Sequence, residues 1–198
     1  MKLLPGQKKP LMLSAVNQSG STVEGSQVGG NFNLTNNYLG AQRGATVIEK
    51  LLAQLQEEVE KELHCSEVLV RLQRYHGGKV HDGVKGLEAK LVHAGRADEV
   101  EDGLERKEAF SKLLESWSLY ASAQEIFAHL LAKAEHLFNT EILPDIDTLK
   151  ISEVNHRVNQ LIVGPTVDEC GASLFKIDHF VAMGMVYWLA EQCFVRWH

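Results

Sequence analysis

The chain has 198 residues, a formal net charge of −6 and a pI near 5.8. This length is enough for one domain with a hydrophobic core and a short additional segment. The acidic balance argues against binding nucleic acid through bulk electrostatics, because such surfaces are usually strongly basic. We therefore expect no direct nucleic-acid partner.

The cysteines and the first residues indicate the compartment. Cys65, Cys170 and Cys193 are widely spaced and odd in number, so they form neither a disulfide framework nor a paired zinc motif. Pro10 and the lysines before it leave only the apolar run 11–16, which is too short for a signal peptide or a membrane span. We therefore expect a soluble, cytoplasmic protein with free thiols and no membrane partner.

Residues 1–44 differ in composition from the rest, and residues 17–44 are rich in Gly, Asn, Ser, Gln and Thr. One interpretation is a flexible tether. The other is a set of short strands that pair between copies in a homo-oligomer, because one such strand cannot bury its own face. In the second case the candidate oligomerisation residues are Val28, Phe32, Leu34 and Tyr38.

Residues 45–198 carry helical periodicity. Apolar residues three and four apart predict a first helix from Ala45 to about Tyr75, where Gly77-Gly78 would end it. A second helix is expected at 83–94. A third segment starts near residue 97 and is one long helix or two, because "SWSLYASAQ" interrupts its pattern.

The second half of this domain continues in the same way. An apolar helical stretch covers 122–144, a further helix covers 151–163 until Gly164-Pro165 breaks it, and a last helix covers 177–193. Nothing after residue 44 alternates convincingly with period two. The sequence therefore predicts an all-α fold, a single helical domain of about five or six helices.

Two groups of residues are catalytic candidates. His81-Asp82, with His64 upstream, is of the type that holds metals in helical phosphohydrolases, but an N-cap role explains Asp82 more simply. Glu88 and Lys90 match the E-x-K element of nucleases. That chemistry needs a strand, whereas helical spacing turns the two side chains about 200° apart.

We therefore predict no catalytic residue, no bound metal and no cofactor. The alternatives that stay open are a metal-dependent helical phosphohydrolase or nuclease, and a plain oligomeric scaffold built through the N-terminal segment.

The order of the helical pieces resembles a known family. The pieces are "LQRYHGG", "VKGLEAKLVHAGR", "ERKEAFSKLL", "SAQEIFAHLLA", "LFNTEILP" and "MGMVYWLAEQCFVRW". Together they resemble the C-terminal domain of ABC three-component systems, the bacterial anti-phage group that includes Lamassu-type defence. The likeness covers about residues 45–197. The polar stretch before it also resembles the low-complexity segment that often precedes that domain.

The resemblance implies a function without enzymatic activity. In the family, this helical domain follows a variable effector and docks it onto a small middle component and an SMC-like ATPase. Residues 1–44 are too few for such an effector. The expectation is therefore an adaptor whose effector is a separate chain, or a solitary adaptor.

The closing residues carry the most specific part of the resemblance. The family motif commonly reads Cys-His-hydrophobic-basic-Trp, and here Phe194 takes the place of the His. The helix before it has too many large apolar residues for one exposed stripe, so it is expected to be the central helix or to lie against a partner. Trp and Arg are typical interface anchors, and Arg is rarely buried unless paired. The candidates for partner binding or domain closure are Trp188, Cys193, Arg196, Trp197 and His198.

Overall fold

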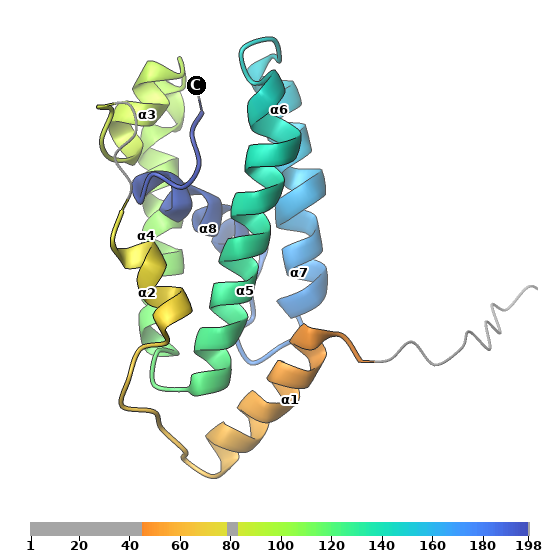
Figure 1. Ribbon diagram of the computed structural model, residues 1–198. Coiled ribbons are helices and arrows are strands. Elements are labelled where there is room, and N and C mark those ends of the chain that lie inside the picture. The colour runs from red at the N-terminus through yellow and green to blue at the C-terminus, as the bar shows by residue number, and fades with distance from the viewer. Residues whose placement is uncertain (1–44, 79–82, 198) are drawn as a thin grey trace, which may run out of the picture. The chain divides into compact units, whose positions relative to one another are not determined.

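Helices make up the regular structure of the computed structural model, which describes residues 45–78 and 83–197 (Figure 1). None of these described residues lies in a β-strand, so the prediction of an all-α fold is confirmed. No helix among them is long and apolar enough to cross a membrane. Residues from Ala45 onward form one compact unit.

The first expected helix is in fact two helices. Helix α1 spans Val47–Glu60 and starts at a capping box, in which Thr46 and Glu49 exchange hydrogen bonds. It ends where Glu62 adopts a left-handed conformation (φ 51°) and the Leu63 amide donates to the Glu58 carbonyl over 2.8 Å. Helix α2 begins only at Val70 and runs to His76.

Tertiary contacts cause this break, so the prediction of one continuous helix from 45 to 75 was wrong. The Cys65 amide donates to the Leu119 carbonyl at 2.8 Å, and the Leu69 amide donates to the Gln124 side chain. These partners lie more than 50 residues further along the chain, so local periodicity could not reveal them.

The middle of the domain follows the predicted order. Helix α3 spans Leu87–His93, and a 3₁₀ turn, η1, at Ala97–Glu99 leads into α4 at Val100–Ser116. A turn at 117–120 separates α4 from α5, which spans Ala121–Leu137. The expected third segment is therefore one helix, α4, and the helix after the turn is α5. The π-helical turn η2 (Phe138–Ile142) and the 3₁₀ turn η3 (Leu143–Asp145) prolong α5.

Gly164-Pro165 does not break the next helical run, contrary to the prediction. Helix α6 spans Ile151–Val158, the π-helical turn η4 spans Asn159–Val163, and α7 spans Gly164–Cys170. Pro165 stands in the first turn of α7, where its missing amide donor is tolerated. The Gly164 amide reaches back to the Asn159 carbonyl, so the wider π turn absorbs the change of register.

Helix α8, His179–Glu191, lies at the centre of the domain (Figure 1). Asp178 caps it by accepting a hydrogen bond from the Val181 amide at 2.9 Å. It contacts α3, α4, α5 and α7, and its residues 184–190 are all buried. Its closest approach is to α4, where Gly184 leaves no space for a Cβ beside the Arg106 carbonyl.

Candidate interaction site at the C-terminal motif

The motif after α8 begins with a reversal of the chain at Cys193. This residue has a left-handed backbone (φ 62°), and the Phe194 amide donates to the Leu189 carbonyl at 2.9 Å. This pattern is a Schellman motif, which is usually completed by Gly rather than by Cys. Because of the reversal, the residues that follow α8 return along the helical body, and Phe194, Val195 and Trp197 are all buried.

Trp197 is held among rings and one cation. Its ring is 5.2 Å from that of Phe138, at a nearly perpendicular angle, and 5.9 Å from that of Tyr187. The guanidinium carbon of Arg96 lies 4.6 Å from its centroid. The last turn of α8, the π turn η2 and the end of α3 are therefore joined through one tryptophan.

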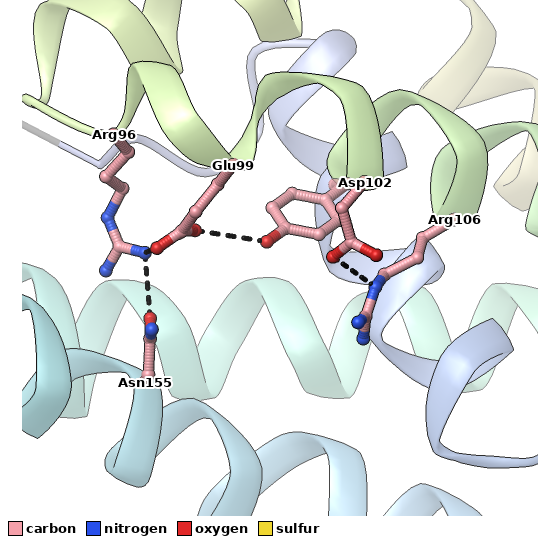
Figure 2. Close-up of polar contacts among 6 residues, drawn as sticks. Arg96, Glu99, Asp102, Arg106 and Asn155 are labelled. Carbon is pink, nitrogen blue, oxygen red and sulfur yellow. Dashed lines mark hydrogen bonds and ion pairs between the residues drawn. The ribbon is translucent and has the colours of Figure 1, made fainter.

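Arg96 is almost fully buried, with 2% of its surface exposed. Its Nη1 donates to both carboxylate oxygens of Glu99, at 2.9 and 2.8 Å, and to the Asn155 side-chain oxygen at 2.8 Å (Figure 2). The Tyr187 hydroxyl donates to Glu99 at 3.3 Å. Burial and the negative charge of Glu99 raise the pKa of Tyr187, so this hydroxyl stays a donor at neutral pH.

A polar cleft of about 260 Å³ opens beside this cluster. Asp102 and Arg106, an ion pair at 2.7 Å, lie on α4 at its edge (Figure 2). The cleft is also lined by Glu99, Asn155, Asn159, Val163, His179, Met183 and Tyr187. Two ion pairs lie at or beside the cleft, Arg106 with Asp102 within α4 and Arg96 with Glu99 at η1, and the hydrogen bond from Arg96 to Asn155 links this region to α6.

Helix α3 and the end of α8 cap each other. The Glu191 carboxylate accepts a hydrogen bond from the Leu87 amide at 2.6 Å, and the Lys90 ammonium donates to the Ala190 carbonyl. A carboxylate thus faces a helix N-terminus and a cation faces a helix C-terminus, which is the favourable sense for both helix dipoles. Lys90 is fully buried in this contact.

The two residues of the E-x-K candidate, Glu88 and Lys90, therefore lie on different faces of α3. Lys90 points into the core toward α8, whereas Glu88 is exposed on the same helix. They share no face, as the helical spacing predicted. His64 lies against Tyr120, with ring centroids 5.1 Å apart, and His81 and Asp82 lie outside the described residues.

The five candidates for partner binding or domain closure differ in their burial. Trp188 and Trp197 are buried, while Cys193 and Arg196 are half-buried. His198 lies outside the described residues, as do the four candidate oligomerisation residues Val28, Phe32, Leu34 and Tyr38.

Sequence reasoning missed Arg96, Lys90 and Asn155. Basic residues are usually solvated, and nothing in the local pattern marks Arg96 and Lys90 as buried or the exposed Asn155 as a partner of Arg96. The available signal was weak: Arg96 follows Gly95, whose left-handed backbone (φ 72°) reverses the chain just after α3. Their role depends on partners from α4, α6 and the C-terminal motif.

Comparison with known families gives one match. Residues 86–197, more than half of the chain, match the family model described as C-terminal domain 9 of the ABC three-component systems. The matched region starts just before α3 and ends at Trp197, so it contains the polar cluster and the C-terminal motif. No curated protein and no solved structure matches the chain.

Proposed function

We propose that this chain, which belongs to the C-terminal domain 9 family of the ABC three-component systems, is a non-enzymatic adaptor. Membership makes it a component of an antiviral defence system that works with other components. In the proposed role, the helical domain docks an effector onto a small middle component and an SMC-like ATPase. The family match is the observation that carries this proposal.

The arrangement of side chains supports an adaptor over the E-x-K nuclease alternative. Lys90, the candidate catalytic lysine, is bonded to the Ala190 carbonyl and is fully buried. The charged groups at the polar cleft are paired locally, Arg96 with Glu99 and Arg106 with Asp102, and Arg96 also bonds Asn155 of α6. These contacts support a rigid body that presents surfaces to partners.

Arg196 is the residue of the C-terminal motif that we place on the docking surface. It is half-buried between the buried Val195 and Trp197, so the packing of its neighbours fixes its position. Guanidinium groups bind carboxylates at protein interfaces, and an unpaired partner carboxylate costs roughly 2–5 kcal/mol of affinity.

The test is co-expression of the full chain with the middle component and the SMC-like ATPase of an ABC three-component system from the same genome, followed by co-purification and mass measurement. We expect a stable complex that contains this chain, and Arg196→Ala should weaken it while thermal stability changes little. Arg157→Ala, which removes an exposed ion pair to Asp145, is the matched control and should leave binding intact. Absence of any complex with the wild-type chain would refute the adaptor role.

The oligomeric scaffold alternative is tested with the same protein. The full chain and a chain starting at Ala45 are compared by light scattering. A self-association that depends on residues 1–44, without binding to either component, would favour the scaffold.

A further inference from the structure

A groove lies between the connection that links α1 to α2 and the start of α5. Its volume is about 250 Å³, and it is lined by Cys65, Glu67, Val68, Leu69, Val70, Ala121, Gln124 and Glu125. Most of these residues precede residue 86, where the family match begins. The groove is therefore distinct from the polar cleft and from the C-terminal motif.

Apolar side chains gather at this groove although they face solvent. Val70, at the first position of α2, is 78% exposed, and Val68 is 42% exposed. Leu63 and Leu119, on the two chain segments that meet beside the groove, are 54% and 53% exposed. We call these four residues the apolar patch. They make up half of the exposed large hydrophobic residues among the described parts of the chain.

The groove is held in shape by Gln124, whose side chain is 2% exposed. Its Nε2 donates to the Ser118 carbonyl at 2.7 Å and to the Glu67 carbonyl at 3.2 Å, and its Oε1 accepts from the Leu69 amide at 2.5 Å. One buried amide therefore connects both walls. A preformed groove loses little conformational entropy when it binds.

The surroundings of the apolar patch are acidic. Residues 57–67 contain five glutamates, Glu57, Glu58, Glu60, Glu62 and Glu67, against one lysine, Lys61. Lys61 is paired with Glu57 at 3.1 Å, and Glu58 is turned toward Ser122 at the start of α5. Glu67 and Glu125 line the groove itself, and Arg71 pairs with Glu125 at 3.4 Å. Glu67 is exposed, so the rim of the groove keeps a net negative charge, and the exposed Glu60 and Glu62 precede it in the chain.

We propose that this groove docks a segment of another protein component of the same complex, one that presents apolar side chains flanked by lysine or arginine. Apolar side chains would cover Val68 and Val70, and the basic groups would meet the glutamates of the rim. An apolar centre with a charged rim of opposite sign is the usual composition of a specific protein interface. This inference rests on the proposed adaptor function and adds the surface and the chemistry of the partner.

The test uses the full chain with the middle component and the SMC-like ATPase as probes, and binding is measured by titration calorimetry. Val70→Asp should lower affinity at least tenfold, because it places a charge in the apolar centre. Aspartate suits the first turn of a helix, so the fold should be retained, as circular dichroism can check. Val92→Asp, at a valine that is 53% exposed on α3, is the matched control and should bind normally.

A second variant tests the charge of the rim. Glu67→Lys should weaken binding and reduce its dependence on salt, whereas Glu105→Lys, at an exposed glutamate of α4, should do neither. If the wild-type chain binds and both groove variants bind equally well, the groove proposal is overturned and the adaptor role stands. If the wild-type chain binds neither component, the adaptor role fails and the groove proposal fails with it. A dimer of this chain that Val70→Asp converts to a monomer would make the groove a self-interface and would also overturn the proposal.

Discussion

Arg96 stacks on Trp197, with the guanidinium carbon 4.6 Å from the ring centroid, and joins the end of α3 to the penultimate residue of the chain. The same guanidinium holds Glu99 and Asn155. One buried cation thus connects α3, η1, α6 and the C-terminal motif. Trp197 is buried because it completes this contact.

Removal of Arg96 should therefore be costly. Arg96→Ala is expected to lower the free energy of unfolding by about 3–5 kcal/mol, since it leaves the Glu99 carboxylate without its buried partner. Arg96→Lys should recover only part of this loss, because an ammonium lacks the planar fork that stacks and bonds at once. Urea unfolding measures the free energy of unfolding of both variants. The control is Arg157→Ala, which removes an exposed ion pair and should lower the free energy of unfolding by less than about 1 kcal/mol. Equal losses in the two alanine variants would contradict the role of Arg96.

Trp197 should matter for stability in its own right. Trp197→Ala is expected to cost about 3–5 kcal/mol, the usual loss for a buried large aromatic side chain. Trp197→Phe keeps a ring beneath Arg96 and should cost less. A chain that ends at Gln192 should melt at a clearly lower temperature in calorimetry. Full stability of that truncated chain would show that the motif is an ordinary tail.

The left-handed backbone at Cys193 predicts an unusual stabilising substitution. An L-residue with φ 62° carries a strain of about 1–2 kcal/mol that glycine avoids. Cys193→Gly should therefore raise the free energy of unfolding, by about 0.5–1 kcal/mol after its own entropy cost. Gln192→Gly is the control: φ at Gln192 is −80°, so glycine relieves no strain there and should only lower the free energy of unfolding. Denaturant titration distinguishes them, and a destabilised Cys193→Gly variant would contradict the account.

The crossing of α4 and α8 requires glycine at position 184. A Cβ there would overlap the carbonyl oxygen of Arg106, which is backbone and cannot move aside cheaply. Gly184→Ala should destabilise the fold by about 1–3 kcal/mol or more. Gly103→Ala is the matched control: its Cβ would meet the flexible end of Leu91 at 3.2 Å, and alanine favours the helix. Similar melting temperatures for the two variants would disprove the close crossing.

Alkaline conditions should weaken the domain through Tyr75. Burial, together with the hydrogen bond that its hydroxyl donates to Glu135 at 2.9 Å, raises the pKa of Tyr75 from 10.0 to about 12. The folded state therefore favours the neutral phenol, so this stabilisation is complete below pH 10 and is lost as the pH rises toward 12. Unfolding by urea at pH 8, 10 and 11 should show the decline, and Tyr75→Phe should make it shallower. An unchanged slope in that variant would assign the decline to other groups.

Periodicity of apolar residues was sufficient to predict the all-α fold and the places of α4, α5 and α8. The reason is that helix formation and amphipathic burial depend on neighbours three and four residues apart. The composition of α8, apolar on every side, was also sufficient to predict that it would be covered. Large apolar residues such as Met185 and Trp188 occur around the whole circumference of α8, so no face of this helix is polar enough to lie in solvent.

Contacts between distant segments determined the rest. The chain leaves the first helix at Lys61 because Leu119 and Gln124 bind the connection, and Gly164-Pro165 continues a helix because a π turn precedes it. Arg96 and Lys90 are buried only because Glu99, Asn155 and the Ala190 carbonyl surround them. A charged side chain enters the core when groups far away in sequence satisfy it, and that satisfaction exists only in the folded structure.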